Sequence, residues 1–369
     1  MTRLSSGATI GILGNGQLGR MLCLAAAPLG FCTHVYGPNK NSPAEQVATT
    51  STVANYDDKT ALATFAKSVD VVTFEFENVP ASTAAYLAAH TKVHPSWKAL
   101  EIAQDRTKEK VFFSKIKAKT ADWRPVNSKD DLKVALKEIG FPAILKTSRL
   151  GYDGKGQVKI KSAVDAEMAW QKLSAGKSIR SKGAFAALES FIDFSCEISI
   201  IAARDEKGTI MCFEPAKNVH ENHMLATSTV PANLDPKIIE ESESITKRAI
   251  QSLDIVGLLA VEMFVTRSGE ILCNEMAPRP HNSGHWTIDA CGTDQFQQLV
   301  RAITGLPLVH PARHSDVEMI NLVGEDYADQ LSSYLANPDA HTHLYGKTES
   351  KPGRKMGHVN ILLPRPGEN

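Results

Sequence analysis

The 369-residue chain lacks the features of membrane and nucleic-acid-binding proteins. It has no run of about 18 consecutive apolar residues, and its first residues show no long apolar stretch behind a basic one, so neither a membrane span nor a signal peptide is predicted. Basic and acidic residues number 41 each, which gives no overall attraction to nucleic acid or to a membrane surface.

Cysteine is scarce and scattered. The six cysteines include no C-x-x-C pair, which favours a reduced, cytoplasmic protein over a disulfide framework. Internal repeats and low-complexity segments are also missing. The length exceeds the size at which a single hydrophobic core keeps growing, so two or three domains that share clefts are expected.

One stretch is predicted to form a hairpin that carries two carboxylates. Val261–Thr266 and Glu270–Asn274 favour strands, and the Ser-Gly pair between them is typical of a tight two-residue turn. Such a turn sets Glu262 directly opposite Glu275. Like charges across a strand pair are destabilising, and a divalent cation is the simplest remedy, since Mg²⁺ is typically held by one or two carboxylates together with phosphates. A solvated hairpin with two incidental glutamates is the alternative.

A glycine-rich turn follows the first predicted strand. Thr9–Leu13 runs into GNGQLG at residues 14–19 and then a helix, which matches the dinucleotide fingerprint in spacing. The second strand, Cys32–Tyr36, ends in Gly-Pro where that fingerprint requires an acid, so NAD is disfavoured and a phosphate of another kind fits better. A third strand, Val69–Phe74, ends at Glu75, a candidate ligand contact because ligands bind at strand ends of open α/β sheets.

A second glycine-rich segment follows a strand that ends in lysine. Pro142–Lys146 leads into TSRLGYDGKGQ at residues 147–157, which does not match a Walker A loop. Its amides and charges could close over phosphates, and an ammonium group neutralises a triphosphate as a compact point charge. The segment is therefore predicted to be a phosphate-binding flap.

Three later segments are polar. Asn218–Pro231 has few apolar anchors and is predicted to be a mobile loop; its two histidines have no third ligand nearby, so zinc is disfavoured. Met276–Trp286 is predicted to be a substrate wall. A basic cluster near the end could grip a phosphate or form a solvated turn; it consists of Lys347, Lys351, Arg354, Lys355 and His358.

Four motifs together resemble one family. ILGNGQLGRML, GYDGKGQ, NEMAPRPHNSGHWT and KPGRKMGHVN are similar to those of the 5-(carboxyamino)imidazole ribonucleotide synthases, ATP-dependent carboxylases of the ATP-grasp superfamily in bacterial and fungal purine biosynthesis. The resemblance implies an α/β and α+β fold, with an ATP-grasp fold preceded by a small doubly wound Rossmann-like domain. The implied domains are residues 1–104, 105–188 with the glycine flap, and 189–369 with the hairpin and the basic tail.

The resemblance also implies a reaction, in which ATP, bicarbonate and aminoimidazole ribonucleotide give ADP, phosphate and the N-carboxylated ribonucleotide through carboxyphosphate. Positioning, charge neutralisation and exclusion of water would do most of the catalysis. The implied cofactors are ATP and Mg²⁺, and the implied assembly is a homodimer.

Site residues implied by the resemblance are matched motif by motif. Phosphate contacts would come from Arg106, Lys146, Gly151, Tyr152, Asp153, Gly154, Lys155, Gly156 and Gln157. The rest of the nucleotide would contact Glu189, Ser190, Phe191, Ile192, Glu197, His220, Asn274 and Glu275. Mg²⁺ would be bound by Glu262 and Glu275, with Asn274 beside them.

The ribonucleotide would lie against Gly16, Gln17, Leu18, Glu75, Tyr152, Arg279, His281, Asn282, Ser283, Lys347 and Arg354. The implied catalytic residues are Asp153, Arg279 and Lys347, with Arg279 stabilising carboxyphosphate and Asp153 assisting proton transfer from the amine. Asn274 and Glu275 are neighbours, so both can reach one site only where their strand ends and twists.

Three alternatives remain open at this point. A formate-dependent glycinamide ribonucleotide transformylase or a biotin-carboxylating relative would share the nucleotide residues but not HNSGHWT or PGRKMGH. A nicotinamide-dependent dehydrogenase would depend on the turn at residues 14–19. An ATP-binding module without catalysis is disfavoured by the intact set of Lys146, Glu262 and Glu275.

Overall fold

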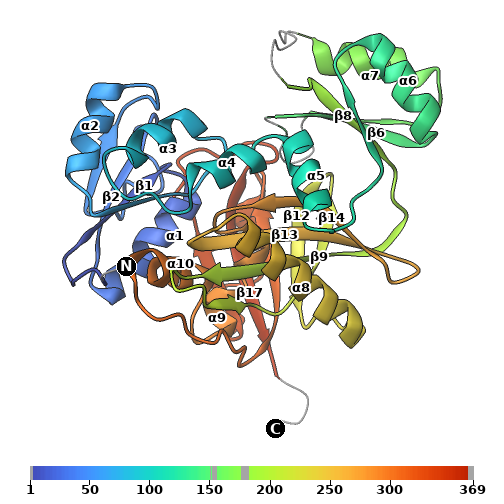
Figure 1. The fold of residues 1–369 in the computed structure, drawn as a ribbon. Helices are drawn as coiled ribbons and strands as arrows, with labels where there is room; N and C mark the ends of the chain where they lie inside the picture. The colour runs from blue at the N-terminus through green and yellow to red at the C-terminus, as the bar shows by residue number, and fades with distance from the viewer. Residues whose placement is uncertain (1–2, 150, 152–155, 176–182, 365–369) are drawn as a thin grey trace.

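Three β-sheets organise the computed structural model, which describes residues 3–149, 151, 156–175 and 183–364. Figure 1 shows the N-terminal sheet in blue, the central sheet in green standing apart from the rest, and a large third sheet that forms the body of the molecule. The predicted fold class is confirmed. No helix in the described part of the chain has both the length and the hydrophobicity needed to cross a membrane.

The N-terminal sheet is parallel, with strand order β3-β2-β1-β4. Its strands are β1 Thr9–Leu13, β2 Cys32–Gly37, β3 Thr50–Val53 and β4 Val71–Phe74. The helices of this part are α1 Gln17–Ala26, α2 Lys59–Lys67, α3 Ala81–Ala88 and α4 Trp97–Ala103, with a short 3-10 turn η1 Ala27–Leu29. Because all strands run the same way, the glycine turn after β1 and Glu75 after β4 meet at one edge.

The central sheet is antiparallel, with strand order β5-β8-β6-β7. Its strands are β5 Trp123–Val126, β6 Ala143–Thr147, β7 Gln157–Ile160 and β8 Ala186–Ser190. Helices α6 Lys129–Ile139 and α7 Asp165–Ser174 share an apolar cluster with it, and α5 Arg106–Lys115 precedes it in the chain. A reciprocal capping box of Ser128 and Asp131 starts α6.

Nine strands form the third sheet, in the order β14-β13-β9-β11-β12-β15-β17-β16, with β10 paired to β9. The strands are β9 Phe194–Arg204, β10 Ile210–Cys212, β11 Ala216–Glu221, β12 Met224–Val230, β13 Gly257–Thr266, β14 Ile271–Ala277, β15 Asp316–Val323, β16 Ala340–Leu344 and β17 Lys355–Leu363. The helical elements are α8 Pro236–Ser252, η2 Asn282–Gly284, α9 Thr287–Ala290, α10 Gln295–Thr304 and α11 Tyr327–Ser332. The domain limits drawn from the sequence stay predictions.

The predicted mobile loop at Asn218–Pro231 is wrong. Strands β11 and β12 form a paired hairpin there, with Asn222 and His223 at positive φ in its turn. Its pattern is inverted, since Asn218 and Ser228 are buried and hydrogen-bonded to each other at 2.7 Å while Val219 is exposed. Polar residues on the buried face conceal a strand from a hydrophobicity pattern.

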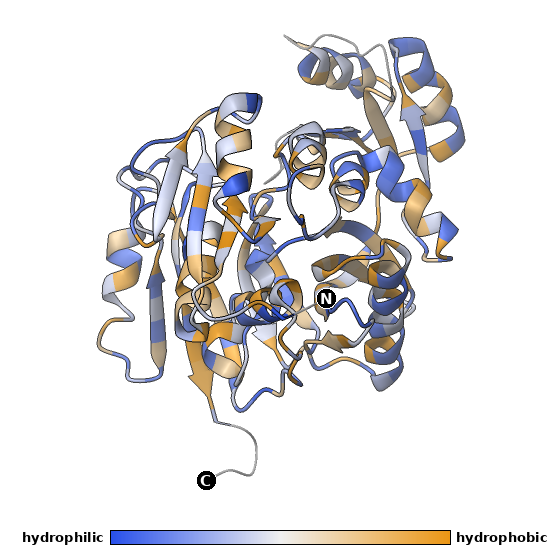
Figure 2. Ribbon diagram, turned by 60° about the vertical axis from the view of Figure 1, so that its left-hand side comes forward, coloured by the Kyte–Doolittle hydropathy of each residue, from blue (hydrophilic) through white to orange (hydrophobic). Residues whose placement is uncertain are grey.

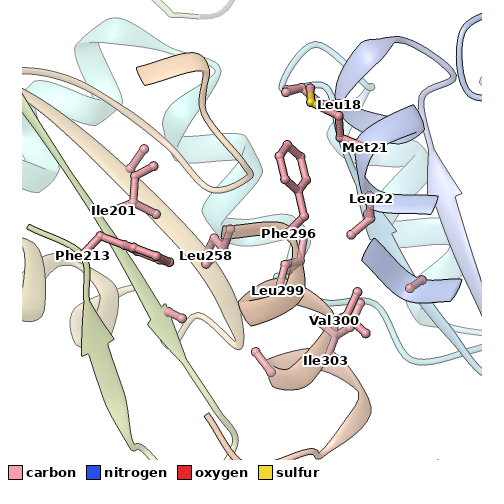
Figure 3. Packing of buried hydrophobic residues seen from close by; sticks show 14 of the residues in the cluster. Leu18, Met21, Leu22, Ile201, Phe213, Leu258, Phe296, Leu299, Val300 and Ile303 are labelled. Atoms are coloured by element: carbon pink, nitrogen blue, oxygen red, sulfur yellow. The ribbon is translucent and has the colours of Figure 1, made fainter. Parts of the chain in front are cut away.

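One hydrophobic core joins the N-terminal sheet to the nine-stranded sheet. Figure 3 shows Leu18 and Leu22 of α1 facing α10, whose Phe296 and Leu299 also face Leu258 of β13. Burying each side chain of this size contributes about 1.5–3 kcal/mol. Figure 2 shows hydrophobic residues along the central strands and hydrophilic residues on loops and outer helical turns. The shared core therefore holds the glycine turn at a set distance from the hairpin of β13 and β14.

A column of aromatic rings joins the motif NEMAPRPHNSGHWT, which contains His285, to the motif KPGRKMGHVN, which contains His358. The rings of His285 and His358 are stacked 4.7 Å apart, and His358 stacks on His343 at 4.6 Å. Tyr345 Oη lies 2.9 Å from His358 Nδ1, and Asn360 Nδ2 donates to the carbonyl oxygen of His285 at 3.0 Å. The segment after the hairpin is thereby tied to β17.

This column predicts a loss of stability in acid. Burial lowers the pKa of His285 and of His358 well below 6.5. A histidine of the unfolded chain gains a proton below about pH 6.5, whereas these two histidines of the folded chain stay neutral. The free energy of unfolding therefore keeps their full contribution above that pH, and it decreases as the pH falls by about 1.4 kcal/mol per pH unit for each group. Replacing one imidazole with a ring that does not titrate should remove its share.

The Tm of thermal unfolding, measured at about pH 7.5 and about pH 5.5, tests this prediction. We expect His358→Phe to lose less stability on acidification than the unsubstituted chain, because the ring still fills the column but no longer titrates. His310→Gln, which changes an exposed histidine, is the matched control and should leave the pH dependence unchanged. Equal pH dependence in all three proteins would contradict the prediction.

Candidate active site

The turn of the β13–β14 hairpin differs from the predicted one. Thr266 N–H donates to Glu270 O, Gly269 N–H donates to Thr266 O, and Gly269 has φ 82°, so the loop has three residues rather than two. An irregularity beside Glu262 then shifts the register by one residue, and Glu262 does lie opposite Glu275. The predicted pairing is confirmed although the predicted turn is wrong.

The same irregularity explains how neighbouring residues reach one site. Cys273 pairs with Met263 and Glu275 with Glu262, which leaves Asn274 as the extra residue of a bulge. A bulge redirects side chains that strict alternation would send to opposite faces. Asn274 Oδ1 accordingly lies 3.4 Å from Lys146 Nζ, while Glu275 Oε2 lies 3.4 Å from Arg106 Nη2.

The facing glutamates are electrostatically strained, and in the described part of the chain only Glu275 has a cation in direct contact, because burial lowers the pKa of His281 well below 6.5. Burial, and then the charge of Glu275, raise the pKa of Glu262 to about 8. His281 Nε2 lies 3.6 Å from Glu262 Oε1, and Arg106 contacts Glu275. Groups of three or more His, Cys, Asp or Glu side chains that could hold a metal do not occur among the described residues, so a cation here would need further oxygen ligands such as phosphates.

A buried carboxylate on β8 gathers three cations. Glu189 is 2 % exposed, and its carboxylate oxygens lie 2.9 Å from Lys146 Nζ, 3.2 Å from Lys110 Nζ and 3.7 Å from Arg106 Nη1. Burial alone would raise the pKa of Glu189, but these cations together hold it well below its usual range. The cations are thus held in place and charge-balanced at the end of β6.

Two residues of this network were missed in the sequence. Glu109 accepts the N–H of Met276 at 2.6 Å, and burial raises its pKa to about 8. Lys110 is 1 % exposed beside Glu189. Both belong to α5, whose many lysines suggest a solvated helix. Their helical spacing could have revealed them, because Glu109 and Lys110 lie four and three residues before Phe113 and so share the buried face of α5.

The glycine turn after β1 binds a carboxylate of the chain itself. The backbone N–H groups of Gly16 and Gly19 donate to the two oxygens of Glu75 at 3.0 and 3.1 Å. A Cβ atom at Gly14 would lie 2.5 Å from Glu75 Oε1, so the close approach requires glycine. Amides that would bind a dinucleotide pyrophosphate are therefore already used, which weakens the dehydrogenase alternative further.

The predicted substrate wall after β14 lines a pocket together with the paired glutamates. Its lining includes Arg106, Glu109, Glu262, Glu275, Arg279 and His281. Arg279 forms an ion pair with Glu77, and His281 Nδ1 lies 2.8 Å from Ser283 Oγ. Both amide atoms of the Asn282 side chain are buried without a hydrogen-bond partner, which leaves a donor and an acceptor for a ligand.

Other predicted site residues lie around this centre. His220 Nδ1 lies 2.5 Å from Glu197 Oε2, and Lys159 Nζ lies 3.5 Å over the ring of the half-exposed Phe191, next to Ser190 and Ile192. Tyr152, Asp153, Gly154 and Lys155 lie outside the described residues, between Gly151 and the strand that begins at Gln157 after Gly156.

Two predictions on the ribonucleotide side need correction. The side chain of Leu18 packs into the core, so Leu18 offers only its backbone to a ligand. His358 is completely buried in the histidine column, so it does not belong to the basic cluster. In that cluster Lys347 Nζ donates to the carbonyl oxygen of Lys355 at 2.5 Å, and Arg354 donates to Glu349 O at 2.9 Å.

Comparison with known proteins relates this geometry to a family. An N5-carboxyaminoimidazole ribonucleotide synthase from Brucella melitensis is 47 % identical over 364 residues, which cover 99 % of both chains. This chain belongs to the N5-carboxyaminoimidazole ribonucleotide synthase family. Family models match along it as a ribonucleotide synthetase preATP-grasp domain at residues 7–104, an ATP-grasp domain at 111–296 and a phosphoribosylaminoimidazole carboxylase C-terminal domain at 318–368.

Solved synthase structures have the same fold. An ADP complex of an N5-carboxyaminoimidazole ribonucleotide synthetase is 42 % identical, with a TM-score of 0.94 over 99 % of this chain and 95 % of that one. The synthase from Aspergillus clavatus, in complex with ADP and 5-aminoimidazole ribonucleotide, is 29 % identical with a TM-score of 0.89, over 97 % of this chain and 94 % of that one. The synthase fold of this chain thus extends across all three sheets.

Proposed function

We propose that this chain catalyses the ATP- and bicarbonate-dependent carboxylation of 5-aminoimidazole ribonucleotide to 5-carboxyaminoimidazole ribonucleotide, in de novo purine (IMP) biosynthesis. Family membership over nearly the whole chain supports the reaction. One observation of the chain's own residues carries the most weight. Glu262 and Glu275, paired across two strands, share a pocket with Arg106 on the nucleotide side and Arg279 on the substrate side.

ATP is proposed to lie where β6, β8 and β14 meet. Lys146 and Arg106 would bind the phosphates, the edge of β8 from Glu189 would bind adenine, and Glu197 would hold the ribose. The support is the cluster of cations on one buried carboxylate and the contact between Lys146 and Asn274. These charges are fixed before a nucleotide arrives, so binding would require little reorganisation.

A magnesium ion is proposed at the paired glutamates. Glu262 and Glu275, with Asn274 beside them, offer oxygen ligands of the type Mg²⁺ prefers. Their position opposite each other supports the proposal, because burial and then their mutual repulsion raise the pKa of Glu262, and a cation would offset that repulsion. When bound, Mg²⁺ would neutralise charge on the phosphates and orient them.

Bicarbonate is proposed to attack the γ-phosphorus of ATP, so that ADP leaves and carboxyphosphate forms. Carboxyphosphate then releases phosphate and provides CO₂ or an equivalent electrophile, whose carbon forms a bond with the amine nitrogen of the ribonucleotide while the amine loses a proton. Arg279 would stabilise carboxyphosphate, because its guanidinium is buried in the pocket close to Glu275. Asp153 would assist proton transfer from the amine, and Lys347 is the third proposed catalytic residue.

The ribonucleotide is proposed to lie between the two edges that the core holds together. Glu75, Gly16, Gln17 and the backbone of Leu18 would contact it from the N-terminal sheet. His281, Asn282 and Ser283 would contact it from the segment after β14, with Lys347 and Arg354 on a third side. The unpartnered Asn282 amide supports this placement. We also propose a cytoplasmic homodimer, as the family resemblance implies.

An ADP-release assay with Mg²⁺ and bicarbonate tests the function. We expect release to be stimulated when 5-aminoimidazole ribonucleotide is added, with carboxylated product formed alongside ADP. Glycinamide ribonucleotide with formate is the matched control and should give no stimulation. If the aminoimidazole ribonucleotide has no effect, the proposed function is wrong.

A further inference from the structure

A buried glutamine at the junction of the N-terminal and central parts contacts three segments at once. Gln104 follows the last turn of α4 and is 5 % exposed. Its Nε2 donates to the carbonyl oxygens of Glu77 and Val79, at 2.6 and 2.5 Å. Its Oε1 accepts from Arg149 Nη2 at 2.5 Å. Neither Gln104 nor Arg149 belongs to the site residues implied by the sequence motifs.

The orientation of this amide is determined by its surroundings. Two carbonyl oxygens require a donor and a guanidinium requires an acceptor, so only one of the two possible amide orientations satisfies all three partners. A glutamate at this position could still accept from Arg149 but would face the two carbonyl oxygens with an oxygen. Glutamine is the side chain that connects both sides.

A partner of the Gln104 amide on each of its sides lines the pocket that contains Glu262 and Glu275. Arg149 follows Lys146, Thr147 and Ser148 at the end of β6, on the nucleotide side. Glu77 belongs to the turn after β4, and its carboxylate forms the ion pair with Arg279 on the substrate side. The four residues Arg149, Gln104, Glu77 and Arg279 all line the pocket that contains the paired glutamates.

We infer that Gln104 is a positioning residue that couples the end of β6 to Arg279 through the backbone and carboxylate of Glu77. The inference rests on the proposed function, because it assigns Gln104 a part in ribonucleotide use. Removing the amide would leave the turn at Glu77 held less tightly, and Arg279 would then spend less time in the position in which it meets carboxyphosphate. Misplacement of such a group by about 1 Å can cost a large part of its effect.

Gln104→Leu keeps the size of the side chain and removes both hydrogen-bonding functions. We expect the KM for the ribonucleotide to rise about tenfold and the product formed per ADP to fall, while the KM for ATP changes by less than about twofold. Arg149→Leu should act in the same direction with a smaller effect. Gln104→Glu should resemble Gln104→Leu, because the carbonyl contacts are lost in both.

A double-mutant cycle decides whether the contact itself matters. If Gln104 and Arg149 act through one contact, the variant with both leucines should lose no more kcat/KM for the ribonucleotide than Gln104→Leu alone. Effects that multiply would overturn the coupling. Equal loss in the KM for ATP and for the ribonucleotide would also overturn it, since that result indicates a general folding defect.

A matched control is available in α10. Gln298 is completely buried. Its side-chain amide donates a hydrogen bond to the carbonyl oxygen of Val309 and accepts one from the N–H of Val309, but it does not line the pocket. Gln298→Leu should lower the Tm without raising the KM for the ribonucleotide; a similar rise would overturn the inference. The unsubstituted chain separates the two proposals. If the ribonucleotide does not stimulate ADP release by that chain, the proposed function is contradicted. If it does, and the Gln104 variants have the same kinetic constants as the unsubstituted chain, only the role of Gln104 is contradicted.

Discussion

Glu275→Gln is expected to lower turnover at saturating ATP by about 100-fold, which is typical of losing one charged group that stabilises a transition state. The amide keeps the shape of the side chain but removes one of the two carboxylates that face each other across β13 and β14. It also removes one of the two carboxylates that pair with Arg106, the other being Glu189. Turnover should recover in part at high Mg²⁺ concentration if the loss lies in metal affinity.

The same hairpin provides the control. Glu270 lies near the turn, is half-exposed and pairs with Lys119, so Glu270→Gln removes an equal charge outside the pocket. We expect that variant to keep its turnover and its Mg²⁺ requirement. Measured by ADP release across a Mg²⁺ titration, unchanged turnover for Glu275→Gln would refute the proposed metal site. Equal losses in both variants would indicate a misfolded hairpin.

The pairing in the β13–β14 hairpin could be predicted from the sequence, but its turn and its bulge could not. Strand-favouring residues and a Ser-Gly pair predicted Glu262 opposite Glu275, and the pairing is correct because two deviations from the predicted hairpin cancel each other. The loop has one residue more than predicted and the bulge at Asn274 compensates for it. A bulge has no reliable pattern of its own, since it depends on what the neighbouring strand and the pocket require.

Local signals placed several elements correctly. The first strand has the predicted ends and the second begins at the predicted Cys32, because apolar runs are properties of adjacent residues. Glu75 was predicted to contact a ligand because it follows a strand, and the structure adds that its carboxylate already binds the glycine turn. That contact joins residues far apart in the chain, which no local pattern encodes.

Burial of charge was the part that could not be predicted. Lys110 and Glu109 look like surface residues of a lysine-rich helix. They are buried because Glu189 of β8 pairs with Lys110 and the N–H of Met276 of β14 donates to Glu109. Asn218 and Ser228 similarly satisfy each other inside the sheet. In each example the compensation comes from tertiary contacts, which overrule the expectation that polar residues are exposed.

Lys146→Met is expected to reduce kcat/KM for ATP by about 100-fold or more, the usual scale for removing a fixed charge that meets a developing negative charge. Burial lowers the pKa of Lys146, and Glu189 opposes that effect at 2.9 Å. The same ammonium lies 3.4 Å from Asn274, beside the proposed metal ligands. A methionine fills the space without supplying charge, so the phosphates would lose a direct partner.

Lys110→Met separates this effect from simple charge imbalance. It removes an equal charge from the same Glu189 carboxylate, 3.2 Å away, at a position that is buried even more completely than Lys146. If Lys146 acts by binding phosphate, Lys110→Met should lower the Tm while keeping most of kcat/KM for ATP. If an unbalanced Glu189 were the cause, both variants would lose ATP use to a similar extent, and a direct role of Lys146 would be wrong.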